Sequence, residues 1–246
     1  MKGFFTHLLI ALKLGLRDKT LLIDFYILPL AFYLIMGSVM SAINPGFKTQ
    51  LITSLVVFGV TMGALQGVSA PIARLRESGT LRAYRVLGVP SWAVLATETL
   101  GPFIHLFISS TIILFTAPLL FHARLPENLP AFFALLAASI AATVSVGLAL
   151  GVFFRAHTAA MLSMVVSIVS VLLGGMMFPS SMLPQTFRYA GLMLPATFSV
   201  EALSGLSFGL KTDFSAWAAV LALILFFILF GTAAAARFAA VNRETA

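Results

Sequence analysis

The run LITSLVVFGVTMGALQGVSAPIA, residues 51–73, contains no charged side chain, and the stretch that follows it, RLRESGTLRAYRVLGVP at residues 74–90, holds four arginines. An apolar run of this length matches a helix that crosses about 30 Å of hydrocarbon. The whole chain of 246 residues has this character, because 60% of its residues are hydrophobic and only 9% are charged. Soluble domains carry about 25% charged residues. The sequence therefore predicts a protein that crosses a membrane several times.

Six stretches are long and apolar enough to be transmembrane helices. They are residues 21–42, 51–73, 92–121, 131–154, 158–178 and 214–236. Pro29 and Pro102 lie within two of these stretches and are expected to kink them, which neighbouring helices tolerate in a membrane. None of the stretches alternates polar and apolar residues as the strands of a membrane barrel do. We therefore predict an all-α polytopic fold, organised as a single transmembrane domain over residues 1–246.

The basic residues are distributed unevenly between the two ends of the predicted helices. Eleven of the fifteen lysines and arginines fall in the N-terminal segment, in the 74–91 loop, at Arg155 or in the C-terminal tail. The remaining four fall on the other side, at Lys48, Arg124, Arg188 and Lys211. Loops rich in Lys and Arg stay in the cytoplasm. We therefore expect both termini and the 74–91 loop to be cytoplasmic, in a multi-pass protein of a bacterial inner (plasma) membrane.

The N-terminal segment, residues 1–19, has an apolar and a basic face when it is drawn as a helix. Leu8 and Leu12 lie on the apolar face, and Lys13 and Arg17 lie on the basic one. This pattern is typical of an amphipathic helix that lies in the cytoplasmic membrane interface, with its basic side chains near anionic headgroups. The bases also interrupt the apolar core that a cleavable signal peptide needs. The alternative is a plain extension of the first span.

The segment between the last two spans, residues 179–213, is neither a transmembrane helix nor a polar domain. Its two apolar pieces, 186–194 and 198–210, are each too short to cross a bilayer. Prolines delimit the pieces, at Pro179, Pro184 and Pro195. We expect a short helical hairpin that dips back into the outer leaflet.

Several common catalytic and binding motifs are absent from the sequence. No Gly-Lys pair occurs, so the chain has no phosphate-binding loop in which to hold ATP itself. It has no cysteine and no two histidines at metal-ligand spacing, so we expect no metal ion and no cofactor bound by this chain. Residues 205–209 spell the G-x-S-x-G pattern of serine hydrolases, but all four histidines precede Ser207, contrary to the order of such sites. The arginines of residues 74–85 are too few, with too few aromatic neighbours, to predict nucleic-acid binding.

Glycines recur at four-residue spacing in two of the spans. The second span has Gly59, Gly63 and Gly67, and the fourth has Gly147 and Gly151. Small residues at this spacing let two helix backbones approach closely. The pattern fits an interface between subunits and packing within one bundle equally well.

Glu98 and His105 are ionisable residues within the third span. Such residues are costly in hydrocarbon, so each is a functional hypothesis by default. They are seven residues apart, which is two helical turns, so they share a face of the helix. As a pair they would form a proton relay, and a proton-coupled secondary transporter is our alternative prediction. Glu98 would otherwise pair with an arginine of the loop before it.

The stretch 74–90 has the pattern of a short amphipathic helix. Apolar residues such as Leu81 and Tyr84 alternate with arginines, and the sequence Ser78-Gly79-Thr80 permits a turn and a helix N-cap. A loop that only marks the cytoplasmic side needs arginines, but it does not need the Glu-x-Gly-Thr-Leu core found at residues 77–81.

This core, placed directly after the second span, resembles the ABC-2 family of ABC-transporter permeases. A second segment is similar to the same family, namely the proline-punctuated stretch that runs from Phe178-Pro179 through Leu194-Pro195-Ala196-Thr197 to Glu201-Ala202-Leu203. Six spans and cytoplasmic termini agree with that family too. The resemblance therefore covers essentially the whole chain.

The resemblance implies an export-type permease with an ABCG-like fold, in which the loop after the second span forms a coupling helix. That helix docks on a separate ATP-binding subunit, which binds the ATP and Mg. Two such subunits and a second permease protomer, identical or different, would complete the transporter. An interface helix of this kind needs apolar anchors and charges that fix its register. The implied coupling residues are Arg74, Arg76, Glu77, Gly79, Thr80, Leu81, Arg82, Tyr84 and Arg85.

The resemblance also implies a substrate pathway lined by the second and fifth spans of two protomers, with the outer hairpin closing its exit. The polar groups available to the pathway are Thr53, Ser54, Gln66, Ser163, Ser167 and Ser170, although such residues also form hydrogen bonds between helices. The hairpin residues are Pro179, Pro184, Arg188, Pro195 and Glu201. With 23 Phe and 10 Met, the chain favours a hydrophobic or amphipathic cargo, such as a drug, a lipid or a lipid-linked glycan, over a small ion.

Overall fold

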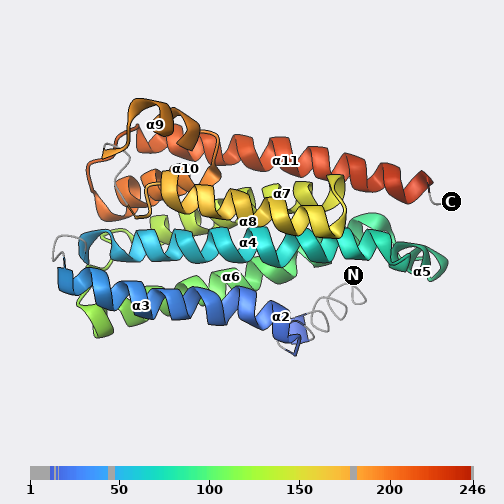
Figure 1. The fold of residues 1–246 in the computed structure, drawn as a ribbon, viewed down its shortest axis with the longest axis horizontal. Coiled ribbons are helices and arrows are strands. Elements are labelled where there is room, and N and C mark those ends of the chain that lie inside the picture. The colour runs from blue at the N-terminus through green and yellow to red at the C-terminus, as the bar shows by residue number, and fades with distance from the viewer. Residues whose placement is uncertain (1–11, 14, 16, 44–47, 178–181, 245–246) are drawn as a thin grey trace.

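A computed structural model describes residues 12–13, 15, 17–43, 48–177 and 182–244 of the chain. Within these ranges every regular secondary-structure element is a helix, and six helices are long and apolar enough to cross a membrane. They lie side by side along the long axis of the molecule (Figure 1). The prediction of an all-α fold with six spans is therefore confirmed. The amphipathic helix predicted at 1–19 falls mostly on residues outside the described ranges.

The first span is a continuous helix with three parts: α2 (Lys19–Leu22), the π-helical segment η1 (Ile23–Ile27) and α3 (Leu28–Ile43). The other five spans are α4 (Leu51–Glu77), α6 (Ser91–Phe121), α7 (Leu129–Phe153), α8 (Ala156–Leu173) and α11 (Ala216–Glu244).

Three of the predicted helix ends differ from the structure. The helix α4 continues to Glu77, so the first residues of the predicted 74–91 loop form its last turn. The helix α8 ends at Leu173 instead of 178, because Gly174 leaves helical geometry and Gly175 adopts a φ of +77°. The last helix, α11, extends beyond the predicted end at 236, since its alanine-rich tail is a strong helix former.

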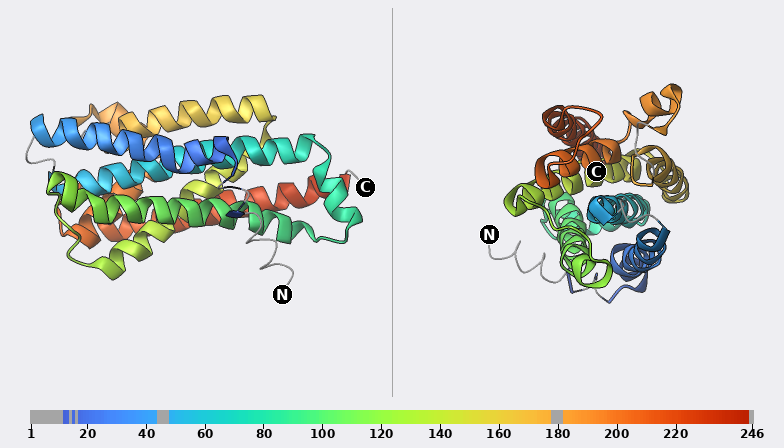
Figure 2. Two further views of the ribbon diagram at one scale, coloured as in Figure 1. Left: turned by 90° about the horizontal axis from the view of Figure 1, so that it is seen from below. Right: turned by 90° about the vertical axis from the view of Figure 1, so that its left-hand side faces the viewer.

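The helix α4 is the core of the bundle. In an apolar stretch of 18 residues within α4, 89% of the residues are buried, compared with 22% in the corresponding stretch of α8 and 17% in that of α11. It packs against α7, α8, α6 and α3, and an end-on view places it in the middle of the other helices (Figure 2). The uncharged run of residues 51–73 is therefore surrounded by protein, whereas the outer helices expose apolar faces.

The repeated glycines serve packing inside this bundle. A methyl group built on Gly147 would lie 2.6 Å from the carbonyl oxygen of Ala64, and one on Gly151 would lie 2.5 Å from that of Ser69, so the backbones of α7 and α4 are in direct contact. The ring of Phe25 lies against Gly67, where an added methyl would meet it at 2.5 Å. Of the two readings of the glycine pattern, packing within the protomer is the one that the structure supports.

The first span departs from regular α-helical geometry directly before Pro29. A proline has no backbone N–H and cannot complete the α-helical hydrogen bond one turn back. The wider turn of η1 accommodates this gap, with the N–H of Leu28 donating to the carbonyl of Ile23. Pro102 lies inside α6, which continues on both sides of it.

The two ends of the bundle have different connections (Figure 1). At one end, which we call the α5 end, the short helix α5 (Thr80–Val86) joins α4 to α6, and the C-terminal part of α11 lies nearby. At the opposite end lie α9 (Gln185–Gly191) and α10 (Pro195–Ala202), the latter continued by the π-helical segment η4 (Leu203–Ser207). The sequence predicted two short helical pieces here, and the structure places their starts at Gln185 and Pro195.

Candidate functional site

The helix α5 is a separate seven-residue helix set off by two glycine turns. Gly79 and Gly88 both adopt a φ of +73°, a conformation that favours glycine over residues with a side chain. The hydroxyls of Ser78 and Thr80 lie 2.7 Å apart and form a hydrogen bond across the first turn. The predicted turn at Ser78-Gly79-Thr80 is therefore confirmed, and α5 begins at Thr80.

The apolar residues of α5 divide between an anchor and an exposed tip. Leu81 is buried in the bundle core and Tyr84 packs against it. Val86 and the following Leu87 are 83% and 76% exposed. The side chains of Arg82 and Arg85 lie outside the described part of the structure. Val86 and Leu87 thus form a small exposed apolar tip at the end of α5.

Arg76 and Glu77 contact the turn between α7 and α8. The Nη1 atom of Arg76 donates to the carbonyl oxygens of Gly151 at 2.9 Å and Phe154 at 3.2 Å. Glu77 Oε1 accepts a hydrogen bond of 3.0 Å from the backbone N–H of Ala156. A cation thus lies at the C-terminus of α7 and an anion at the N-terminus of α8, the arrangement that helix dipoles favour. We call these three hydrogen bonds the Arg76–Glu77 clamp.

The remaining predicted residue on this stretch, Arg74, is exposed at the last turn of α4. Among the residues that the structure describes, it forms no ion pair or hydrogen bond, unlike its neighbour Arg76. The two arginines therefore differ: the side chain of Arg76 is engaged within the protomer, and that of Arg74 is available at its surface.

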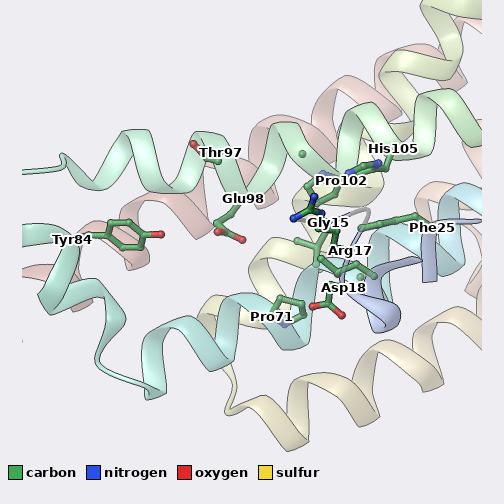
Figure 3. A pocket seen from close by; sticks show the side chains of 14 residues that line it. Gly15, Arg17, Asp18, Phe25, Pro71, Tyr84, Thr97, Glu98, Pro102 and His105 are labelled. Carbon is green, nitrogen blue, oxygen red and sulfur yellow. The ribbon is translucent and has the colours of Figure 1, made fainter. Parts of the chain in front are cut away.

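A cavity of about 510 Å³ opens beside α5 (Figure 3). Its wall comes from the segment before α2, from η1, and from α4, α5 and α6. Arg17 and Asp18 are exposed side chains on this wall, and Glu98 points into the space between Tyr84 and Arg17. Across the described part of the chain, no three His, Asp or Glu side chains are grouped closely enough to hold a metal ion.

His105 forms one end of this cavity and is held in place by two aromatic neighbours. Tyr26 places its hydroxyl 2.9 Å from His105 Nδ1, and the ring of Phe25 stacks on the imidazole at a centroid distance of 5.6 Å and an interplanar angle of 12°. Glu98 and His105 thus line one cavity, as their spacing predicts, but no hydrogen bond between them is present. Neither Arg74 nor Arg76 pairs with Glu98, and the side chains of Arg82 and Arg85, the other arginines of the preceding loop, lie outside the described part of the structure.

The predicted pathway residues lie mainly between α4 and α8, inside the protomer. The Oγ atoms of Ser163 and Ser69 are 2.6 Å apart. The amide of Gln66 donates to the sulfur of Met62 at 3.3 Å. Four of the six predicted pathway residues have a buried hydroxyl without a hydrogen-bond partner among the described residues: Thr53, Ser54, Ser167 and Ser170. The outward face of α8 is instead apolar, with Met161, Met164, Val165 and Ile168 exposed.

The predicted hairpin residues connect the opposite end of the bundle to α11. Glu201 is buried, and its Oε2 atom accepts hydrogen bonds from the backbone N–H groups of Asp213 at 3.0 Å and Phe214 at 3.4 Å. The guanidinium of Arg188 lies 5.1 Å from the centre of the Phe214 ring, within cation–π range. Pro184 precedes α9 and Pro195 is the first residue of α10, whereas Pro179 lies outside the described residues.

The sequence did not reveal the clamp or the cavity. The partners of Arg76 are backbone carbonyls 75 and 78 residues away, and a carbonyl carries no sequence signal. The cavity joins Arg17 and Tyr84 to the face of α6 that carries Glu98. Two signals for the cavity were available in the sequence: the shared helix face of Glu98 and His105, and the small residue Gly101, where an added methyl group would meet nothing within 4 Å.

The fold and these features define a polytopic helical membrane protein with a short arginine-bearing helix and a cavity of charged and apolar lining at one end of its bundle. Comparison with protein families gives the particular family: the model of the ABC-2 family transporter protein matches residues 23–236. The chain belongs to the ABC-2 family and is a transmembrane permease of an ABC transporter, as its sequence pattern predicts. Membership implies association with an ATP-binding subunit. No curated protein shows significant sequence similarity to the chain.

Proposed function

We propose that this permease exports a hydrophobic or amphipathic substrate and that α5 is the element through which a separate ATP-binding subunit drives it. The observation that carries the proposal is the position of α5. The helix joins α4, the core helix of the bundle, to α6, and it presents Val86 and Leu87 at the tip of the α5 end. Exposed apolar residues beside several arginines suit a groove with apolar pockets and acidic groups.

Movement of α5 would reach most of the bundle through α4. The last turn of α4 carries the Arg76–Glu77 clamp, which fixes it to the α7–α8 turn. Leu81 seats α5 in the core at the same end. Packed helices with direct backbone contact transmit a displacement as rigid bodies instead of absorbing it. A push on α5 would therefore shift α4, α7 and α8 together.

We propose a complex of two permease protomers, identical or different, and two ATP-binding subunits. ATP and Mg would be bound by those subunits. The apolar outward face of α8, which includes Met161 and Ile168, is the surface offered to a second protomer or to lipid. The α5 end would face the cytoplasm, in agreement with the excess of Lys and Arg there. In a bacterium, this orientation corresponds to a permease of the inner membrane.

The substrate pathway would run along α4 and α8 near the second protomer. In the protomer the hydroxyls of Ser167 and Ser170 are buried between these helices without partners, and in a bundle of this kind such groups are costly. A separation of α4 from α8 during transport would expose them to the pathway. The segment α9–α10, held to α11 by Glu201, would close the exit at the opposite end.

The experiment that tests this function is co-expression of the permease with candidate ATP-binding subunits that have no membrane spans of their own. Copurification, and ATP hydrolysis that rises when the permease is present, are expected. The ABC-exporter proposal is contradicted when no ATP-binding subunit copurifies and a pH gradient alone drives export from vesicles. That second result would support the proton-coupled alternative, which one observation favours: Glu98 and His105 line the same cavity.

A further inference from the structure

The cavity beside α5 contains an acidic side chain for which the described residues provide no partner. Glu98 lies two turns into α6, and its carboxylate forms no hydrogen bond or ion pair with any residue that the structure describes. The rim of the cavity carries two further exposed charged side chains, Arg17 and Asp18. Asp18 accepts a hydrogen bond from the backbone N–H of Thr20. With one cation and two anions, the charged groups of the cavity sum to a single negative charge.

Apart from Thr97 and His105, the rest of the cavity lining is apolar or aromatic. Leu21, Phe25, Val68 and Pro71 are among the lining residues. The ring of Tyr84 lies across from Glu98 (Figure 3). The volume of about 510 Å³ is within the range of 300–1,000 Å³ that is typical of small-molecule sites. Small-molecule sites are typically lined by apolar side chains with a few polar groups at fixed positions.

Parts of the wall are fixed before any ligand arrives. Phe25 is held between Gly67 and the ring of His105, and the hydroxyl of Tyr26 restrains that ring. Gly101 keeps the space open, because a methyl group built on it would meet nothing within 4 Å. A preformed wall lowers the entropic cost of binding.

We propose that this cavity binds an amphiphile that carries an ammonium group, with the cation on Glu98 and the apolar body against Phe25 and Tyr84. A lone carboxylate at the edge of hydrocarbon gains most from an organic cation, since such a ligand supplies both the missing charge and apolar contacts. The aromatic rings add cation–π attraction. The ligand is either a soluble cationic amphiphile or the aminoethyl headgroup of a membrane lipid, and both present the same chemistry.

The inference rests on the proposed export function for its role, which is to hold cargo at the α5 end before transport. Its test does not need the ATP-binding subunit, so failure of binding and failure of ATP coupling are separate results. The test uses the full chain purified in detergent and the fluorescent monocationic amphiphile rhodamine 6G, whose fluorescence polarisation rises when it is bound.

The variant Glu98→Gln is expected to weaken dye binding about tenfold or more, and Glu98→Asp is expected to retain most of it. The matched control is Glu127→Gln, which removes an acidic residue at the opposite end of the bundle that is paired with Arg124. Gly101→Leu is expected to weaken binding by filling the cavity while leaving Glu98 in place. Unchanged thermal unfolding of this variant would separate lost binding from lost folding.

Competition experiments identify which chemical group of the ligand the cavity recognises. Octylammonium is expected to displace the dye, whereas octanol and octyl sulfate, which have the same chain, are not. Displacement by dioctanoyl phosphatidylethanolamine but not by dioctanoyl phosphatidylglycerol would assign the site to a lipid headgroup, and displacement by octylammonium alone would assign it to a soluble cation. The inference is overturned when Glu98→Gln binds the dye as tightly as the unaltered chain, or when octanol competes as well as octylammonium.

Discussion

Arg76 and Glu77 are adjacent in the sequence, yet they hold the ends of two different helices: Arg76 donates to carbonyls at the C-terminus of α7, and Glu77 accepts from the first turn of α8. Opposite charges on neighbouring residues thus match the opposite dipole ends that meet at one turn. This clamp connects the core helix α4 to the turn between α7 and α8. The proposed transmission of movement from α5 depends on it.

Arg76→Ala is expected to destabilise the permease. The change removes two hydrogen bonds from a charged donor, each worth about 1.5–3 kcal/mol at most, and partial exposure of the site reduces this value. A net loss of about 2 kcal/mol would lower the unfolding midpoint by roughly 4–8 °C, because each kcal/mol shifts the midpoint by about 2–4 °C in a protein of this size. Thermal unfolding in detergent, followed by the fluorescence of Trp92 and Trp217, measures it. Arg74→Ala is the matched control, and an equal loss in both variants would contradict the clamp.

Glu77→Arg is expected to abolish ATP-driven transport while the protein still inserts into the membrane. The new cation would lie at the N-terminus of α8, where the helix dipole disfavours it by about 0.3–1 kcal/mol, and the bond to Ala156 would be lost. Glu77→Gln retains an acceptor oxygen and is expected to keep most of the activity. Transport into vesicles that contain the ATP-binding subunit measures the difference. Normal transport by Glu77→Arg would show that this residue has no role in coupling.

Gly147→Ala and Gly151→Ala are expected to force α7 away from α4. The added methyl groups would lie within about 2.6 Å of backbone oxygens, and neither backbone can yield without moving its helix. Overpacking of this kind costs about 1–3 kcal/mol. Gly231→Ala on α11 is the control, because its methyl would lie 3.8 Å from the nearest atom. Thermal unfolding compares the three variants, and equal midpoints would argue against backbone contact between α4 and α7.

Glu201→Ala is expected to loosen the segment before α11. The backbone N–H groups of Asp213 and Phe214 would lose their acceptor in a partly buried setting, at a cost of at most about 1–3 kcal/mol. Glu201→Gln keeps one acceptor oxygen and is expected to cost less. Faster hydrogen exchange at residues 208–215 in the alanine variant is the expected observation. Exchange in the alanine variant that is no faster than in the unaltered chain would show that the side chain does not hold this segment.

The sequence predicts the number and order of the helices, because length and apolarity are enough to identify a span. It does not predict which helix is central. The helices α4 and α8 are both apolar, but one is surrounded by protein and the other is largely exposed. Lipid chains are as apolar as leucine side chains, so hydropathy does not separate a protein-facing surface from a lipid-facing one.

The sequence predicts the candidate site only in part, because contacts between distant helices leave no signal in a single sequence. The turn at Gly79 and the anchor at Leu81 are local features, and the local sequence predicts them correctly. The clamp and the cavity are formed by residues that are distant in the sequence, such as Arg76 with Gly151 and Arg17 with Glu98. A single sequence carries periodicity along one helix, but it carries no information on which helix faces it.

The most direct test of the central claim, that α5 receives the ATP-binding subunit, uses the absence of cysteine from the chain. Val86→Cys places a single thiol at the tip of α5, and Met193→Cys places one at a similarly exposed position, 79% accessible, at the opposite end. A short thiol-to-amine cross-linker is applied to membranes that contain the permease and its ATP-binding subunit. The account predicts a cross-linked product from Val86→Cys, with a yield that changes on ATP binding, and none from Met193→Cys. A product from Met193→Cys alone, or none from Val86→Cys while the subunits still copurify, would contradict it.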